Sequence, residues 1–115
     1  MIVYGIPNCN TVKKALTWLD ENGFRYEFHD FKKKGITAEK LTDWCTAFGS
    51  EKVLNKKGST WRKLTEEEQE QTLSKAGAIS ILRKYTSAIK RPVIEKNGKA
   101  VLIGFDEVAY ANQLK

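Results

Sequence analysis

The 115-residue chain is predicted to fold as an α/β protein with one four-stranded mixed sheet and helices packed on its faces. Three observations predict this class. A short apolar run at the N-terminus is followed by an amphipathic helical pattern and then by an alternating strand, which is the order of a β-α-β unit. Several helical patterns fill the middle of the chain. Near the C-terminus, Asn97-Gly98 separates two apolar runs, and this dipeptide is the strongest short-range signal for a β-hairpin.

The N-terminal third of the sequence supplies the β-α-β unit. A first strand is predicted over Ile2 to Tyr4, and a first helix over roughly Cys9 to Asn22, where apolar residues recur at helical spacing. Residues 24–30 alternate apolar and polar side chains, which predicts a second strand parallel to the first. His29 falls on the polar phase of this alternation, so we expect it to face solvent. The lysines at 32–34 are predicted to form a solvated turn.

The middle of the chain is predicted to be helical. Thr37 is suited to cap a helix that ends near Gly49. Thr65 and Glu68 form a capping-box pattern that begins a further helix, and Gly77 is expected to separate this helix from the next one. Residues 55–63 are basic and aperiodic, so we predict a loop there.

The remaining elements complete the sheet. The apolar runs on either side of the Asn97-Gly98 turn should pair as antiparallel strands, and Asp106 is suited to cap a short last helix. The strand order is predicted to be 2-1-3-4, in a single domain spanning residues 1–115. This is the thioredoxin-like arrangement, with a helical insertion over about residues 36–88 between strands 2 and 3.

Cys9 stands where the first strand gives way to the first helix. The first turn of a helix carries backbone N–H groups without intrahelical partners and a partial positive charge, and both lower the pKa of a thiol placed there. Thr11 is placed to add a hydroxyl donor. The alternative is that Asn8 or Asn10 caps the helix while Cys9 is a small buried apolar residue. Position alone leaves both interpretations open.

The second cysteine has a different setting. Cys45 belongs to one continuous apolar helical face with Leu41, Trp44 and Phe48, so we predict a core residue. Two cysteines and one histidine are too few for a disulfide framework or a zinc site, and no metal is expected.

Composition narrows the class of protein. The hydrophobic fraction of 41% and the charged fraction of 30% are typical of a soluble globular protein. The N-terminus has no secretory pattern and no apolar run is long enough to span a membrane, so a cytoplasmic protein without a membrane partner is expected. The net charge of +6 is compatible with an anionic partner, although a surplus of this size more often serves solubility.

Two motifs, Tyr4-x-x-Pro7-x-Cys9-x-Thr11 and Ile89-x-Arg91-Pro92-Val93, resemble those of the ArsC (arsenate reductase) family. That family also contains the Spx regulators and the YffB-like proteins. The segment 53–62 is most similar to the YffB-like branch, which is regarded as glutathione-dependent thiol reductases. The resemblance implies a thioredoxin-like fold, a nucleophilic Cys9 and an arginine, Arg91, that binds an oxyanion or a thiolate. Pro92 is expected to be a cis-proline beside the thiol.

The sequence departs from that family in two places. Arsenate reductases of the family bind the oxyanion with three arginines, and only Arg91 has a counterpart here, because the second position holds Asn55 or Lys56 and the third falls on Gly104-Phe105. Arsenate reduction is therefore disfavoured as the native activity. Spx-type regulators carry a Cys-x-x-Cys switch, and Val12 occupies the place of the second cysteine, so that disulfide cannot form here.

The favoured hypothesis is an oxidoreductase in which the single thiol of Cys9 forms a mixed disulfide that glutathione or a glutaredoxin resolves. Glutathione is then a co-substrate, and no bound cofactor is expected. A monomer acting on a small-molecule or protein disulfide is predicted. Cys9 and Arg91 are the expected catalytic residues, and the residues expected to bind substrate lie near the thiol and in the basic segment: Asn8, Thr11, Lys56, Lys57, Arg62 and Pro92.

Two other functions are alternatives to the reductase. As the resemblance to Spx implies, the domain would dock on RNA polymerase or another protein without turnover, with Cys9 a vestige or a redox sensor. Nucleic-acid binding through the basic segment and Trp61 has the charge it needs, but the chain contains no recognisable nucleic-acid-binding module, and we disfavour it.

Overall fold

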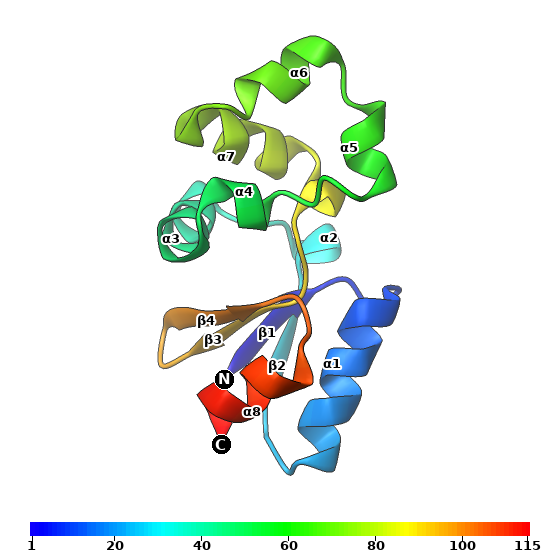
Figure 1. Cartoon of the computed structure of the whole chain (residues 1–115), viewed down its shortest axis with the longest axis vertical. Helices are drawn as coiled ribbons and strands as arrows, with labels where there is room; N and C mark the ends of the chain where they lie inside the picture. Colours follow the sequence, from blue (N-terminus) through cyan, green and yellow to red (C-terminus); the bar gives the residue numbers. More distant parts are fainter. The chain divides into compact units, whose positions relative to one another are not determined.

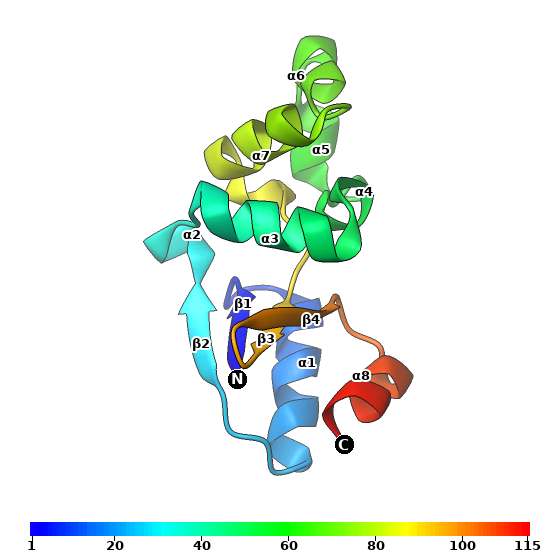
Figure 2. The ribbon, with the colours of Figure 1, turned by 90° about the vertical axis from the view of Figure 1, so that its left-hand side faces the viewer.

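The computed structural model describes residues 1–115 of the chain, which divides into two compact units (Figures 1 and 2). The first unit consists of Met1–Lys34 and Arg91–Lys115, and the second of Gly35–Lys90. The first unit contains the whole β-sheet. The second contains the helices that the sequence places between the second and third strands.

The first unit has the predicted thioredoxin-like topology. Its sheet has the order β2-β1-β3-β4, with β1 parallel to β2 and antiparallel to β3, and with β3 and β4 forming a hairpin. Its elements are β1 (Ile2–Gly5), α1 (Asn10–Glu21), β2 (Glu27–Asp30), α2 (Phe31–Lys34), β3 (Val93–Lys96), β4 (Lys99–Ile103) and α8 (Glu107–Leu114).

The local signals explain where these elements turn and begin. Asn97 and Gly98, at the hairpin, have φ angles of 55° and 78°, the left-handed conformation that a two-residue hairpin turn requires. The Asp106 side chain accepts a hydrogen bond from the N–H of Val108 at 3.2 Å and so caps α8 as predicted. Asn22 is the C-cap of α1. The next residue, Gly23, has a φ angle of 75°, the left-handed conformation that commonly follows the end of a helix.

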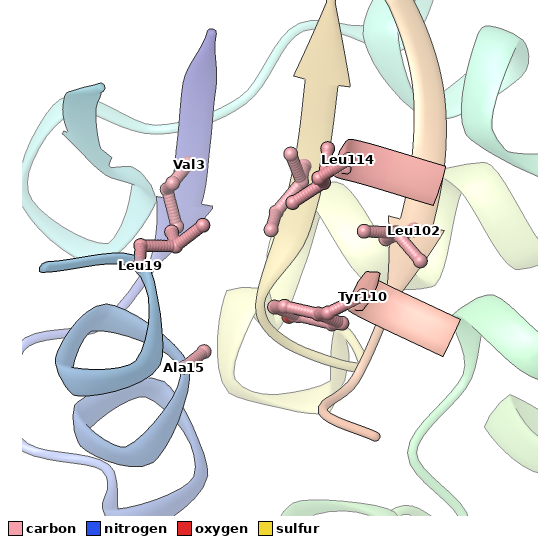
Figure 3. Close-up of a cluster of buried hydrophobic side chains, with 7 residues drawn as sticks. Val3, Ala15, Leu19, Leu102, Tyr110 and Leu114 are labelled. Carbon is pink, nitrogen blue, oxygen red and sulfur yellow. The ribbon is translucent and has the colours of Figure 1, made fainter. Parts of the chain in front are cut away.

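Apolar side chains of α1 and α8 pack on one face of this sheet. Figure 3 shows side chains from both helices and from the strands pointing into the same space. Tyr110 is the largest of them, and its ring makes edge-to-face contacts with Trp18 and Phe105 at centroid distances of 5.5 and 4.9 Å. The cluster of buried residues is Val3, Ala15, Leu19, Ile94, Leu102, Tyr110 and Leu114.

Two predictions for the segment after α1 are wrong. Strand β2 spans only Glu27–Asp30 rather than residues 24–30, because it is strand only where it pairs with the four residues of β1. The lysines at 32–34 form the helical turn α2 instead of an irregular turn. The Asp30 carboxylate accepts hydrogen bonds from the N–H groups of Lys32 and Lys33 at 3.0 and 3.2 Å, which is the action of a helix cap.

The second unit is entirely helical apart from one isolated bridge between Leu54 and Ile89. Thr37 caps α3 and Gly49 ends it, and Thr65 and Glu68 form a complete capping box at α6, all as predicted. Cys45 lies in α3 and is only 5% exposed, so it is the predicted core residue. The elements are α3 (Ala38–Phe48), α4 (Ser50–Val53), α5 (Ser59–Lys63), α6 (Glu66–Gln71), α7 (Lys75–Lys84) and the 3-10 helix η1 (Thr86–Ala88).

The loop predicted over residues 55–63 is wrong in its second half, where α5 forms. A helix of five residues is too short to show a period in the sequence, and no side chain caps its N-terminus. Its last turn carries Arg62 and Lys63, whose positive charges are favourable at the C-terminal end of a helix.

Gly77 does not separate two helices as predicted; it lies inside α7. The helix begins two residues earlier, after Ser74, whose side chain accepts a hydrogen bond from the N–H of Gly77 at 3.0 Å. A Cβ atom on Gly77 would lie 1.8 Å from the backbone oxygen of Gln71. The residue is therefore glycine because the end of α6 approaches α7 closely, not because a helix ends there.

Gly77→Ala is expected to destabilise the protein by about 1–3 kcal/mol, because the backbone of α6 must move to admit the methyl group. In an unobstructed helix the same exchange would stabilise by about 1 kcal/mol, so the sign of the effect is the test. Urea unfolding measures it. Ala76→Gly, at an exposed position of the same helix, controls for helix propensity, and a Gly77→Ala protein more stable than the wild type would contradict the close approach.

Candidate active site

The end of β1 lies close to the first turn of α1, and this closeness positions Cys9. A Cβ atom on Gly5 would lie 3.0 Å from Cγ2 and 3.3 Å from Cγ1 of Val12, so a larger residue at position 5 would press on the helix. Cys9 is the N-cap of α1, with extended backbone angles of φ −143° and ψ 123°. Its carbonyl accepts the first hydrogen bond of the helix, from the N–H of Lys13 at 2.9 Å. Its sulfur therefore lies at the first turn of the helix, next to the N–H groups that have no partner within α1.

The surroundings of the Cys9 sulfur favour its thiolate. Partial burial acts to raise the pKa of Cys9, but hydrogen bonds from the backbone N–H of Val12, from the Arg91 side chain and from the backbone N–H of Thr11, together with the positive charge of Arg91, outweigh that effect. The pKa of Cys9 therefore lies below its ordinary value. Burial has the opposite outcome for Cys45, whose pKa it raises despite the nearby charge of Lys75. The two cysteines therefore differ in the direction of their pKa shifts, which is downward for Cys9 and upward for Cys45.

Arg91 belongs to the segment that enters β3, and the Arg91–Pro92 bond is cis, as predicted. Two hydrogen bonds tie this segment to α8. The Pro92 carbonyl accepts from the N–H of Gly104 at 2.8 Å, and the Gly104 carbonyl accepts from the hydroxyl of Tyr110 at 2.5 Å. Burial raises the pKa of Tyr110, so this hydroxyl stays protonated as a donor. The core that holds α8 thus also holds the strand segment that carries Arg91.

A buried polar pair lies on β1 and β3, and the sequence did not predict it. Glu95 is 2% exposed and its Oε1 accepts a hydrogen bond from the hydroxyl of Tyr4 at 3.1 Å. His29 was expected to face solvent, but it is half-buried, with its ring 4.9 Å from that of Tyr4. The sequence pattern indicates for Tyr4 only an apolar strand residue. Successive side chains of a strand point to opposite faces of the sheet, so Tyr4 and Glu95 share the face opposite that of Val3 and Ile94. This shared face is the sequence signal that could have predicted the pair.

The predicted site residues fall in both units. Cys9, Asn8, Thr11, Arg91 and Pro92 belong to the first unit, where Asn8 and Thr11 are exposed and Pro92 is buried. Thr11 acts on the sulfur through its backbone N–H, not through the hydroxyl that the sequence suggested.

The three basic residues predicted to bind substrate, Lys56, Lys57 and Arg62, belong to the second unit and are exposed. The ammonium group of Lys56 is hydrogen-bonded to the carboxylate of Glu51 at 2.8 Å. Their role in binding substrate stays a prediction, as do the roles of the other site residues.

A cavity of about 340 Å³ lies beside α1 in the first unit, with Phe105 and Glu107 on its other side. It begins at Lys13, one helical turn beyond Cys9, and Lys14 adds a second cation. Trp18 gives it an aromatic wall. No group of three or more histidine, cysteine, aspartate or glutamate side chains is arranged to hold a metal ion. None of the helices has the length and apolar character needed to cross a membrane.

The sequence of this chain matches the model of the ArsC family over residues 4–112. The chain belongs to the ArsC family. Among solved structures, a YffB protein superposes with a TM-score of 0.93 at 46% identity, covering 99% of this chain and 98% of that one. An arsenate reductase (ArsC) related protein from Brucella melitensis superposes with a TM-score of 0.76 at 39% identity, covering 99% and 93%. The resemblance to the YffB-like branch is confirmed.

Curated relatives of this ArsC-family chain include proteins with different descriptions. An uncharacterized protein of Haemophilus influenzae is 44% identical over 108 residues, which is 94% of this chain and 93% of the relative. The global transcriptional regulator Spx of Streptococcus pyogenes is 27% identical over 103 residues, or 88% and 75%. Membership of the family is therefore shared by proteins related to arsenate reductases and by regulators of transcription.

The thiol of Cys9 is expected to titrate with a midpoint below about 8.5, the value of an unperturbed cysteine. Ultraviolet absorbance of the thiolate against pH, in a Cys45→Ala background, measures the midpoint. Arg91→Ala should raise it, because the variant removes a hydrogen bond and a positive charge from the thiolate. Arg25→Ala, which removes an exposed arginine that does not act on Cys9, should leave it unchanged. A midpoint at or above about 8.5 would make Cys9 an ordinary thiol.

A lowered pKa in the folded state also predicts how stability depends on pH. Between the folded pKa of Cys9 and its unfolded value of about 8.5, the unfolded state binds more protons, so the contribution of Cys9 to stability rises with pH. It is fully present above about 8.5 and is lost as pH falls through the folded pKa. The difference in free energy of unfolding between the parent and a Cys9→Ser variant, followed from pH 6 to 9.5 by urea unfolding, should therefore grow with pH. A flat or falling difference would contradict the shift.

Proposed function

We propose that this protein is a thiol-dependent oxidoreductase that uses Cys9 as its nucleophile and glutathione as its co-substrate. The observation that carries the proposal is the setting of the Cys9 sulfur, which combines the first N–H groups of α1 with the Arg91 side chain. A thiolate so stabilised is populated at a pH at which an ordinary cysteine is mostly protonated, and the thiolate is the form that attacks disulfides.

The reaction proceeds by two thiol–disulfide exchanges. The Cys9 thiolate attacks the glutathionyl sulfur of a mixed disulfide between glutathione and a substrate thiol; that S–S bond breaks, and the substrate leaves as a thiolate and takes up a proton. Cys9 now carries a glutathionyl group. A second glutathione thiolate attacks the glutathionyl sulfur, which releases oxidised glutathione and restores the Cys9 thiolate. In total, the substrate sulfur is reduced to a thiol and the sulfur of the second glutathione is oxidised, while the first glutathione sulfur is in a disulfide before and after the reaction.

Cys9 is the single cysteine of the first unit, and this supports an external thiol in the second step. Val12 stands three residues after Cys9, and the other cysteine, Cys45, belongs to the second unit, where it is 5% exposed. Arg91 is proposed to bind a carboxylate of glutathione. A glutaredoxin in place of the second glutathione would give the same balance of thiols and disulfides.

Arsenate reduction is a weaker proposal for this chain. A tetrahedral oxyanion is best held by several guanidinium groups that donate paired hydrogen bonds. Arg91 is the one guanidinium that acts on the Cys9 sulfur. The place of a third arginine falls on Gly104, whose N–H is already bonded to the Pro92 carbonyl at 2.8 Å. Gly104 therefore holds the Pro92 segment by its backbone, and neither Gly104 nor Phe105 has a positively charged side chain.

A protein-binding role without turnover is the second candidate. The similarity to a global transcriptional regulator over 88% of this chain favours it. In that case Cys9 would serve as a redox sensor or have no role, and the domain would act by docking on a partner such as RNA polymerase.

Incubation with oxidised glutathione should add one glutathionyl group to Cys9 and none to Cys45, and reduced glutathione should remove it. Mass spectrometry of the intact protein and of its peptides measures both steps. Arg91→Ala should slow the addition on the order of 10-fold, which corresponds to a loss of roughly 1.4 kcal/mol. Cys9→Ser should abolish it.

Arg25→Ala is the matched control, because it removes an arginine of the same unit that does not act on Cys9. Absence of any modification, or labelling of Cys45 at the rate of Cys9, would overturn the reductase proposal. The protein-binding role would then be the better account of the same fold.

A further inference from the structure

A second cavity of about 430 Å³ lies in the second unit, between α5 and the segment formed by α6 and the turn that follows it. These two helices are neighbours in the chain and in space (Figure 1). We call this cavity the α5–α6 groove. Trp61 of α5 lines one side and Leu73, after α6, lines the other. Of its residues, only Lys56 is also among the residues expected to bind the substrate of Cys9.

The groove has an apolar side chain, Leu73, that is not buried within the fold. Leu73 is 82% exposed, the most exposed large apolar side chain of the protein. The backbone of Leu73 is nevertheless held in place. Its N–H donates to the carbonyl of Glu70 at 3.1 Å, and Gln71, two residues before it, lies against Gly77 of α7. An apolar side chain held in solvent on a fixed turn is the kind of contact that a binding partner covers.

The groove contains several hydrogen-bond acceptors that the fold does not use. The amide nitrogen of Gln69 donates to the carbonyl of Trp61 at 3.0 Å, and the hydroxyl of Thr72 donates to the carbonyl of Gln69 at 2.6 Å. The Thr72 hydroxyl and one of the two N–H groups of the Gln69 amide are thus used within the fold. The acceptors of the lining that no hydrogen bond within the fold uses are the amide oxygen of Gln69 and the carboxylates of Glu66 and Glu70.

The groove is also acidic, although the chain as a whole carries a net charge of +6. Glu66 and Glu70 are four residues apart on α6, so they lie on the same side of the helix, and neither forms an ion pair. The single cation of the lining is Lys56. Its ammonium group is bonded to Glu51 at 2.8 Å and lies 5.3 Å from the centre of the Trp61 ring. Its charge is therefore already balanced from outside the groove.

We propose that the α5–α6 groove binds a peptide segment of a partner protein in which an arginine or lysine stands next to an apolar residue. The basic side chain donates to Glu66 and Glu70, and the apolar neighbour covers Leu73 and the exposed edge of Trp61. A peptide fits better than a small amine, because an amine would satisfy the carboxylates and leave Leu73 in solvent. The proposal involves no step at Cys9 and is independent of the proposed reductase function.

The test uses the intact protein labelled with nitrogen-15 and the peptide acetyl-Leu-Arg-Ser-Leu-Arg-Ser-amide. The indole N–H signal of Trp61 and the side-chain amide signals of Gln69 should shift and saturate with a dissociation constant below about 1 mM. The same peptide with Glu in place of Arg, or with Ser in place of Leu, should bind at least about fivefold more weakly, since each lacks one of the two contacts.

Variants of the protein separate the groove from general charge. Glu66→Gln with Glu70→Gln should weaken binding at least about fivefold, and Leu73→Ser should do so without a change of charge. Glu67→Gln, in the same helical turn but outside the groove, should leave the affinity unchanged. The proposal is overturned if no saturable shift is seen, if Glu67→Gln weakens binding as much as the double variant, or if spermidine binds as tightly as the peptide.

Discussion

The structure of the candidate site depends on the unpaired N–H groups in the first turn of α1. A helix must satisfy these donors or leave them to water, and here the N–H groups of Thr11 and Val12 act on the Cys9 sulfur. Their position follows from the strand before them. Gly5 has no side chain, so the end of β1 can lie against Val12, and three residues of chain suffice to bring Cys9 to the N-cap. The packing of β1 against α1 therefore also determines where the Cys9 sulfur lies.

Arg91 reaches the same sulfur from the other half of the first unit, more than eighty residues later in the sequence. It arrives there because β3 pairs antiparallel with β1, with Tyr4 opposite Val93. The hydrogen bonds from Tyr110 to Gly104 and from Gly104 to Pro92 then hold the approach to β3 in place. The register of the sheet and the burial of α8 thus determine that Arg91 lies beside the Cys9 sulfur. Attraction between the two side chains would not be enough to bring them together.

The sequence predicted the elements whose signals are local. The hairpin at Asn97-Gly98, the caps at Thr37 and Thr65, the strand order and Cys9 at the start of α1 all follow from turn chemistry, capping and periodicity. The errors arose where tertiary contact decides. Gly77 looked like a helix end because its close approach to Gln71 cannot be read from the sequence, and the Tyr4–Glu95 pair depends on which residues of two distant strands share a face.

Net charge is a poor guide to recognition in this protein, because charge acts over short distances. At physiological ionic strength exposed charges are screened beyond about 8 Å, so a partner responds to the groups it meets locally. At the Cys9 sulfur the charged group is Arg91, whereas the cavity beside α1 has Lys13 and Lys14 together with Glu21 and Glu107. In the α5–α6 groove the acidic groups are Glu66 and Glu70. The overall surplus of +6 therefore describes the charge of neither surface.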